Sequence, residues 1–157
     1  MRIDPCAAAD LLAALHAAAF SEAQSEVWSK ADIADLLMSP GVLAHLARER
    51  DDPIGFILAR IAADEAEVLT LAVRPDFRRR GAGRALVAAA AEAAEIAGAK
   101  VLFLEVAEDN LTAVALYESC GFRPTGRRKD YYVRAGARID ALALRRELNR
   151  PMGGHYA

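Results

Sequence analysis

The sequence predicts a single domain of the mixed α/β (α+β) class. Helix-like and strand-like segments follow one another in the order ααβββαβαββ. Hydrophobic residues make up 54% of the 157 residues, which is enough to bury a substantial core. Because no repeat or linker divides the pattern, we expect one domain over residues 1–148. The segment 149–157 contains a proline and two glycines and is expected to be a flexible tail.

The first two elements are predicted to be helices. Asp4 and the proline after it are typical of an N-cap and a first helical residue, so a helix is expected from Pro5 to Phe20. Ser29 and Asp32 have the spacing of a capping box, in which each side chain accepts a hydrogen bond from the other residue's amide. This spacing predicts a second helix from Lys30 to Met38.

Three strands are predicted next. The strand-like segments Val42 to Glu49 and Ile54 to Ala62 are joined by residues 51–53 (Asp-Asp-Pro), which are typical of a hairpin turn. Glu67 to Val73 is the third strand. It leads directly into a loop that is rich in arginine and glycine.

Helices and strands alternate in the second half of the chain. A long helix is expected over Ala82 to Ala97 and a shorter one over Asn110 to Cys120, because a glycine follows each segment. Lys100 to Val106 is a strand whose hydrophobic residues run on without alternation, which indicates burial on both faces. Tyr131 to Val133 and Ile139 to Leu144 are predicted to form a final antiparallel pair.

The composition argues against several classes of protein. With 20 basic and 22 acidic residues, the net charge of −2 does not suit a dedicated nucleic-acid or membrane-surface binder. Two cysteines are too few for a disulfide scaffold, so we expect a cytoplasmic location. No signal peptide is visible, and the apolar run 85–97 is short and contains two glutamates. The three histidines lack metal-ligand spacing, so no metal is expected.

The loop after the third strand has the properties of an anion-binding site. It comprises Arg78, Arg79, Arg80, Gly81, Ala82, Gly83 and Arg84. The two glycines allow a sharp turn and leave the first amides of the following helix open in front. Those amides lack intrahelical partners and carry partial positive charge, which favours a phosphate or pyrophosphate. The neighbouring arginines favour the same ligand.

Other interpretations of this loop are weaker. Gly81 and Gly83 match the first two glycines of a dinucleotide-binding fingerprint, but the third glycine is missing. Two antiparallel hairpins also fit a doubly wound parallel sheet poorly. A P-loop is excluded because no Gly-Lys-Ser/Thr sequence follows. A plain helix start is the remaining alternative.

The loop and the segments after it resemble the GNAT superfamily of acetyl-CoA-dependent N-acetyltransferases. Residues 78–83 match the R-x-x-G-x-G/A signature of that superfamily. Residues 104–106 (Leu-Glu-Val), Asn110 and residues 115–122 (Ala-Leu-Tyr-Glu-Ser-Cys-Gly-Phe) resemble the second half of the same pattern. The resemblance implies a GNAT-like fold, with a central, mostly antiparallel twisted sheet that is splayed at the cofactor site and flanked by helices. It also implies acetyl-CoA as cosubstrate.

The resemblance assigns the cofactor-binding residues. The backbone of the arginine- and glycine-rich loop would hold the pyrophosphate of CoA, and the end of the preceding strand would pair with the pantetheine arm as an added strand would. Asn110 would donate to or accept from the pantetheine amides. The residues so assigned are Leu71, Ala72, Val73, Arg78, Arg79, Arg80, Gly81, Ala82, Gly83, Arg84, Asn110 and Tyr117.

Glu105 and Tyr117 are the candidate catalytic residues. Glu105 lies in an otherwise apolar strand, where burial raises the pKa of a carboxyl group toward the range of a general base. A plain strand-end position near solvent is the alternative. Tyr117 and Asn110 lie seven residues apart and so share one helix face, where Tyr117 could protonate the departing thiolate. The alternatives are a core aromatic and a helix N-cap. A covalent route through Cys120 is disfavoured, since no histidine is near it in sequence.

The acceptor site is assigned by a narrower resemblance. Trp28-Ser29 and residues 127–132 (Arg-Arg-Lys-Asp-Tyr-Tyr) resemble RimI-type ribosomal-protein alanine N-acetyltransferases. Trp28, Tyr131 and Tyr132 would then line the groove for the acceptor peptide. Val27 departs from relatives in which a proline precedes the tryptophan.

The resemblance implies direct transfer of acetyl from acetyl-CoA to an N-terminal alanine of a small-subunit ribosomal protein, in a ternary complex. The alternatives are an acetyltransferase for small-molecule amines or other protein N-termini, and a non-catalytic acyl-CoA-binding regulatory module.

Overall fold

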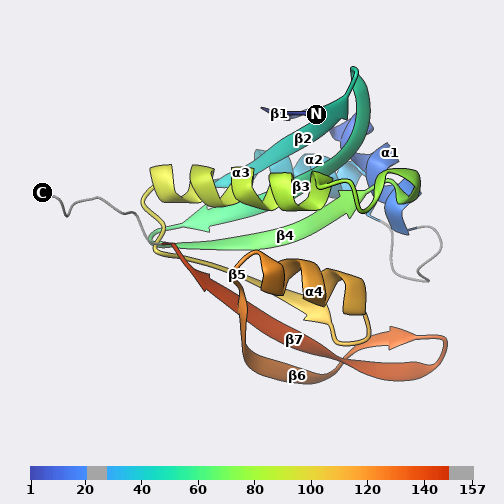
Figure 1. Ribbon diagram of the computed structural model, residues 1–157, viewed down its shortest axis with the longest axis vertical. Coiled ribbons are helices and arrows are strands. Elements are labelled where there is room, and N and C mark those ends of the chain that lie inside the picture. Colours follow the sequence, from blue (N-terminus) through green and yellow to red (C-terminus); the bar gives the residue numbers. More distant parts are fainter. Residues whose placement is uncertain (21–27, 149–157) are drawn as a thin grey trace, which may run out of the picture.

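The computed structural model describes residues 1–20 and 28–148, which form a seven-stranded sheet with helices on both faces (Figure 1). The strand order is β1-β2-β3-β4-β5-β7-β6. The elements are β1 Arg2–Pro5, α1 Ala9–Phe20, α2 Lys30–Met38, β2 Val42–Glu49, β3 Asp52–Ala62, β4 Glu65–Val73, a 3₁₀ turn Pro75–Phe77, α3 Ala82–Ile96, β5 Val101–Ala107, α4 Leu111–Ser119, β6 Arg123–Arg134 and β7 Ala137–Glu147. The mixed class predicted from the sequence is confirmed.

The sheet separates into two halves between β4 and β5. All other neighbouring strands pair antiparallel, whereas β4 and β5 pair parallel, and only through residues 65–67 of β4 and 101–103 of β5. Beyond these residues the two strands diverge, as Figure 1 shows. The expected splayed, mostly antiparallel sheet is therefore present. The remainder of β4 pairs with β3 on one side, and on the other side a gap in the strand pairing separates it from β5.

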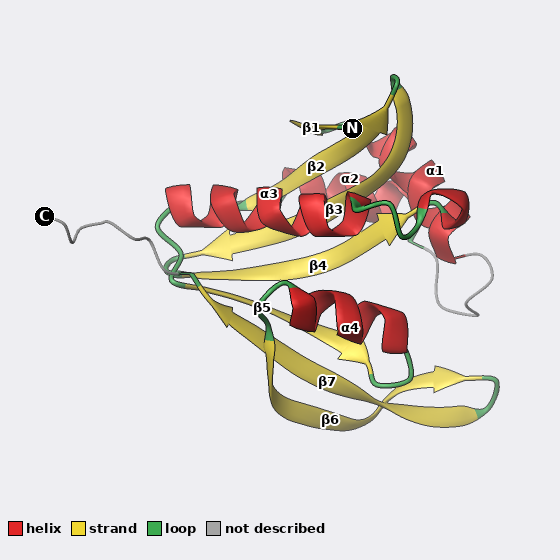
Figure 2. Ribbon diagram, in the orientation of Figure 1, coloured by secondary structure: helices red, strands yellow, loops and turns green. Residues whose placement is uncertain are grey.

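Helices cover the sheet on both faces, α3 and α4 on one and α1 and α2 on the other (Figure 2). The core under α3 is built mainly from Leu86, Val87, Leu102, Leu104 and Leu144. The core under α1 and α2 is built mainly from Leu12, Ile33, Leu46, Phe56 and Leu58. In Figure 2, α1 and α2 lie behind β2, β3 and β4, away from the β5–β7–β6 half.

The predicted helix start at Asp4 is wrong, because residues 2–5 form the edge strand β1. They pair antiparallel with β2, with Arg2 opposite Arg48 and Pro5 opposite His45. The Cys6 amide then donates to the Ala44 carbonyl at 3.0 Å, and α1 begins only at Ala9. A proline is tolerated at an edge strand because it need not donate to a ladder. The N-cap pattern is local, whereas the partner strand lies about forty residues away and leaves no local signature.

The second predicted helix is confirmed with its capping box. The Ser29 hydroxyl accepts from the Asp32 amide at 3.1 Å, and the Asp32 carboxylate accepts from the Ser29 amide at 3.0 Å. These bonds hold the pKa of Asp32 below its ordinary value, the bond from the Ser29 backbone contributing most. The capping box fixes where α2 starts, and with it the position of Trp28 just before it.

The last two strands are longer than the sequence predicted. β6 starts at Arg123, and β7 reaches Glu147. The charged residues of β6, which resemble a solvated loop in the sequence, instead form the exposed outer strand of the sheet. The loop expected over 21–27, with Val27, and the tail expected over 149–157 lie outside the described residues. No helix among the described residues is long and apolar enough to cross a membrane.

Candidate active site

The glycine-led start of α3 offers backbone donors at its first turn. Gly81 is the N-cap and has φ of +90°, a conformation that favours glycine. The first bond into the helix runs from the Ala85 amide to the Gly81 carbonyl at 3.0 Å. The amides of Ala82, Gly83 and Arg84 precede that bond, and no described side chain caps this end. This end of α3 therefore has the geometry of an anion site.

The loop arginines fix the loop by contacts within the chain. The Arg78 guanidinium donates to the carbonyls of Val73 at 3.1 Å and Ala19 at 2.9 Å, which ties the end of β4 to the end of α1. The Arg84 guanidinium donates to the Ser119 hydroxyl at 2.8 Å and so ties α3 to α4. The loop's anion-binding capacity therefore rests first on its amides.

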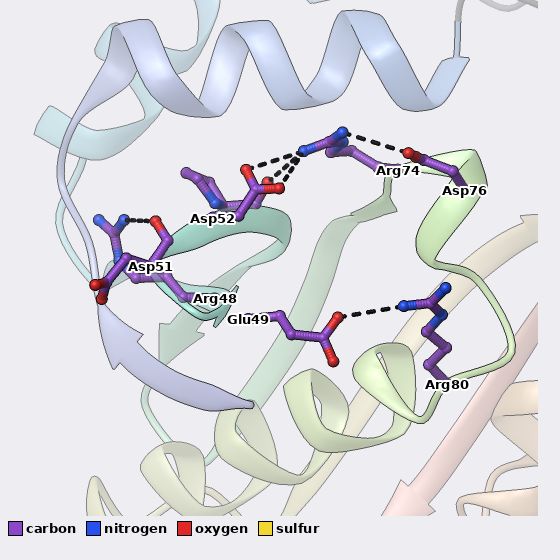
Figure 3. A network of polar contacts seen from close by, with 8 residues as sticks. Arg48, Glu49, Asp51, Asp52, Arg74, Asp76 and Arg80 are labelled. Atoms are coloured by element: carbon purple, nitrogen blue, oxygen red, sulfur yellow. Dashed lines mark hydrogen bonds and ion pairs between the residues drawn. The ribbon is translucent and has the colours of Figure 1, made fainter.

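A polar network links this loop to the β2–β3 hairpin (Figure 3). Arg74 pairs with Asp52 at 3.1 Å and with Asp76 at 3.4 Å. Arg80 pairs with Glu49 at 3.4 Å. The guanidinium groups of Arg74 and Arg80 both lie over the ring of Phe77, at 4.8 and 5.0 Å from its centroid. Sequence reasoning missed this network because Glu49 and Asp52 lie more than twenty residues upstream of the arginines they pair with.

Gly83 brings α4 close to the start of α3. A Cβ on Gly83 would lie 2.9 Å from Cδ2 of Leu116 and 3.9 Å from Cδ2 of Leu71. A side chain there would force Leu116 to move. The glycine therefore lets the two helices and the end of β4 meet at the mouth of the gap between β4 and β5.

The end of β4 presents a strand edge to that gap. Leu71, Ala72 and Val73 pair with β3 opposite Ile57, Phe56 and Gly55, and they lie beyond the last β4–β5 pair. Backbone groups on the gap side are therefore in position to pair with an extended ligand. Of the cofactor-binding residues expected from the sequence, residues 71–73 and 78–84 are brought together at this edge and the start of α3, whereas Asn110 and Tyr117 lie on α4.

Glu105 lies on β5 and is paired rather than isolated. Its side chain is 22% exposed, and its Oε2 lies 2.6 Å from Nε of Arg128 on β6. Both residues line a cavity of about 270 Å³. The other main lining side chains are those of Glu67, Phe103, Thr125 and Arg145. The sequence predicted a carboxylate in an otherwise apolar strand, and the structure adds the cation that compensates it.

Tyr117 is a core aromatic residue and Asn110 is a helix N-cap, which are the alternatives that the sequence left open for them. Tyr117 is 6% exposed and packs edge-on against Phe122, with ring centroids 5.6 Å apart. Burial raises the pKa of its hydroxyl, and Cys120 and Tyr132 act in the same direction. The Asn110 side-chain oxygen accepts from the Ala113 amide at 3.2 Å and caps α4. Tyr117 thus stays protonated, and the amide nitrogen of Asn110 is not used by the cap.

A bulge in β6 directs Arg128 toward Glu105. The pairing register with β7 shifts between Arg128 and Tyr132, and Asp130 has φ of +55°. Asp140 holds the bulge by accepting from the Asp130 amide at 2.9 Å and from Arg127 at 3.0 Å. The same two bonds, the amide bond first, lower the pKa of Asp140.

The two predicted acceptor tyrosines lie at this bulge, whereas Trp28 lies elsewhere. The Arg128 guanidinium sits 4.9 Å from the Tyr131 ring centroid, and the Tyr131 and Tyr132 rings meet edge-on at 5.0 Å. Trp28 instead lines a separate hollow of about 370 Å³ with Asp32, Asp35 and Leu36. The structure therefore joins Tyr131 and Tyr132 to Glu105 through Arg128 and does not join Trp28 to that cluster.

Trp28 is anchored by a buried histidine. Its amide donates to Nδ1 of His16 at 3.3 Å, and the two rings stack with centroids 5.1 Å apart. His16 is 3% exposed, and burial lowers its pKa. Because Nδ1 accepts this bond and a protonated imidazole has no acceptor nitrogen, the His16 ring is neutral when the bond is made.

Stability is expected to fall as the pH is lowered from 7 to 5. A histidine whose pKa is lowered on folding binds more protons in the unfolded state. Its contribution to the free energy of unfolding is therefore complete above the pKa of the unfolded state and is lost as the pH falls below it. Urea denaturation at the two pH values measures this loss. His16→Asn keeps an acceptor for the Trp28 amide without a titrating ring, so its loss of unfolding free energy between pH 7 and pH 5 should be smaller. An equal loss in both proteins would contradict the assignment.

Three charged residues of the cavity were missed by sequence reasoning. Arg128 belongs to a charge run that resembles a solvated hairpin, and nothing local marks the bulge that directs it inward. Glu67 and Arg145 sit on strands in which charged residues usually face solvent. Only the strand pairing, which is non-local, puts them beside Glu105. No group of three or more metal-ligating residues is found in the described part of the chain.

The splayed sheet, the uncapped start of α3 and the carboxylate on β5 beyond the last β4–β5 pair are features of one class of proteins, and comparison with known families identifies the same class. Residues 9–122 match the acetyltransferase (GNAT) family, and the chain belongs to this family.

Two relatives are similar beyond the family level. Over 94 residues the chain is 39% identical to the [ribosomal protein bS18]-alanine N-acetyltransferase of Salmonella typhimurium, covering 60% of this chain and 64% of that protein. The chain thus spans slightly less than two thirds of the length of this curated relative. The crystal structure of the Escherichia coli ribosomal-protein-S18-alanine N-acetyltransferase superposes with a TM-score of 0.83 at 31% identity, covering 99% of this chain and 97% of that one.

A more distant solved structure shares the fold alone. Arabidopsis thaliana NAA60 in complex with acetyl-CoA superposes with a TM-score of 0.80 at 19% identity, covering 94% of this chain and 98% of that one.

Proposed function

We propose that this chain transfers acetyl from acetyl-CoA to the α-amine of an N-terminal alanine of a small-subunit ribosomal protein. The observation that carries the proposal is the gap between β4 and β5, which has anion-binding amides at its mouth and Glu105 on the strand that borders it. The similarity to ribosomal-protein alanine N-acetyltransferases supports the choice of acceptor. We take the acetyltransferase domain to span residues 1–148 and the protein to act in the cytoplasm.

The residues around the gap fit acetyl-CoA. The amides of residues 82–84 would bind the pyrophosphate, and the edge of Leu71–Val73 would pair with the pantetheine amides. The amide nitrogen of Asn110 would donate to the same arm. A structural neighbour with this fold, NAA60, binds acetyl-CoA. When bound, the cosubstrate supplies a thioester carbonyl as the electrophile.

The acid–base residues suit an N-terminal amine. Such an amine has a pKa near 7.8 and is about 14% neutral at pH 7, whereas a lysine is only about 0.04% neutral. Glu105 accepts a proton from the amine, directly or through a water, as the nitrogen attacks the thioester carbon. The C–S bond then breaks, and the Tyr117 hydroxyl donates its proton to the departing thiolate. The raised pKa of Tyr117 keeps that proton in place until it is needed.

The acceptor peptide would enter on the face where the cavity beside Glu105 opens. Tyr131 and Tyr132 would bind its backbone next to the reacting amine, and Trp28 would contact residues farther along. Direct transfer requires both substrates to be bound at once, because the amine itself attacks the thioester. Positioning of the two substrates then supplies much of the acceleration.

Acetylation of a peptide panel tests the proposal. The peptides differ in their first two residues, and the panel includes N-terminally blocked peptides whose only amine is a lysine, together with small amines. Mass spectrometry should detect one added acetyl group on the N-terminus of alanine-led peptides and much slower reaction elsewhere. Faster acetylation of a small amine would mean that the acceptor is a small molecule and not an N-terminal alanine. Binding of acetyl-CoA without transfer to any amine would indicate a regulatory module instead.

A further inference from the structure

A second carboxylate shares the cavity with Glu105. Glu67 on β4 pairs with Phe103 on β5, and this is the last pair before the two strands separate. Paired residues of parallel strands point to the same face, and so do alternate residues of one strand. The side chains of Glu67, Phe103 and Glu105 therefore lie on one face, and all three line the 270 Å³ cavity.

The charges around this cavity distinguish the two carboxylates. Glu105 has Arg128 at 2.6 Å, whereas no ion pair of 4.0 Å or less joins Glu67 to a cation in the described part of the chain. Arg60 lies opposite Glu67 on β3, and Arg145 on the cavity wall is paired with Glu147 at 2.7 Å. Glu67 is thus the less compensated of the two carboxylates.

The environment of Glu67 favours proton uptake. Burial raises the pKa of its carboxyl, and the neighbouring Glu105 raises it further, while Arg60 and Arg128 act in the opposite direction. Two like charges in one cavity bind a proton, or a cation, more readily than either would alone. An ammonium group bound between them would relieve this repulsion.

We propose that Glu67 is a second proton acceptor of the active site, which holds the acceptor's ammonium group and takes its first proton, so that Glu105 can take the second. The inference rests on the proposed function and deepens it. It assigns the substrate class as a primary ammonium ion, bound in its charged form. The α-ammonium group at the N-terminus of a peptide is such an ion.

Two carboxylates match the number of protons that the nitrogen must lose. An ammonium nitrogen carries three hydrogens, and the amide product carries one. The first N–H bond breaks as a proton passes to the Glu67 carboxylate, which leaves a neutral amine. The second breaks as the amine attacks, with its proton passing to Glu105. Tyr117 gives its proton to the thiolate and is reprotonated from one of the two carboxyl groups. One proton is released to solvent in each turnover.

The test compares Glu67→Gln with Glu65→Gln, using an alanine-led peptide and acetyl-CoA. Both variants remove one carboxylate from β4, but Glu65 is exposed and lies outside the cavity. At pH 7 the kcat/KM of Glu67→Gln for the peptide should fall about sevenfold, because only about 14% of the amine is neutral in solution. At pH 9 the deficit should shrink to about twofold or less, since the solvent has by then removed the first proton. The KM for acetyl-CoA should not change.

Several outcomes would overturn the inference. A deficit of equal size from pH 6.5 to pH 9 would indicate a purely structural role, and an equal loss in Glu65→Gln would indicate a general effect of net charge. Glu67→Asp keeps a carboxylate and should retain a flatter pH profile than Glu67→Gln; identical profiles would count against proton transfer. Wild-type protein that acetylates no peptide would refute the proposed function itself, and the inference with it. Active wild type with an unaffected Glu67→Gln would refute the inference alone.

Discussion

Glu105→Gln is expected to lower kcat for peptide acetylation at pH 7 by about 100-fold or more, the range usually lost with a general base. Glutamine has nearly the same shape, so it can still occupy the cavity wall, but it cannot accept a proton from the amine. The affinity for acetyl-CoA should be unchanged, because the cosubstrate is held by the start of α3 and the edge of β4. Steady-state kinetics with an alanine-led peptide measures the first quantity, and titration calorimetry measures the second.

The ion pair with Arg128 requires a control for this experiment. Removing the Glu105 carboxylate also leaves Arg128 without its partner, although Arg128 is 60% exposed and can be solvated. Asp4→Asn removes a carboxylate from a pair of the same length, which Asp4 forms with Arg2 on the edge strand β1, outside the cavity. That control should keep wild-type kcat. A Glu105→Gln variant with normal turnover would exclude Glu105 as the base, and a loss shared by Asp4→Asn would point to a general effect of broken ion pairs.

The sequence predicted those parts of the fold that are encoded locally. The capping box at Ser29 and the boundaries of α2 and β2 are determined by residues a few positions apart, and all of them were predicted correctly. The long helix α3 was likewise predicted to within one residue. The helix expected at Asp4 was wrong, because the conformation of residues 2–5 depends on the distant partner strand β2.

The same distinction holds for the candidate site. Sequence motifs indicated the anion-binding start of α3 and the pair Glu105 and Tyr117, because the family pattern is carried by short segments. They placed Arg128 within the segment 127–132 without giving it a role, and they did not indicate Glu67; the positions of these two side chains depend on the bulge in β6 and on the last pair of the β4–β5 ladder. Charge was the only local signal that Glu67 gave, and charge alone is typical of a solvated strand. The electrostatics of a splayed sheet are therefore decided mainly by pairing register.

Tyr117→Phe is expected to lower kcat by about 100-fold while leaving the fold and the binding of acetyl-CoA intact. The substitution removes only the hydroxyl, so the edge-on contact with Phe122 and the packing of α4 are kept. Without a proton donor the thiolate must leave unprotonated, which slows cleavage of the C–S bond. Stopped-flow detection of free CoA measures the rate, and thermal denaturation checks that the variant folds.

The interpretation of this result depends on separating the hydroxyl from the ring. Tyr117→Leu removes both and should also lower the melting temperature, because the ring is 6% exposed and lies in the core. If Tyr117→Phe melts like wild type but turns over slowly, the hydroxyl acts on the reaction. If Tyr117→Phe keeps full activity and only Tyr117→Leu is impaired, Tyr117 is a core residue, and the departing thiolate must take its proton from water or from another group at the gap.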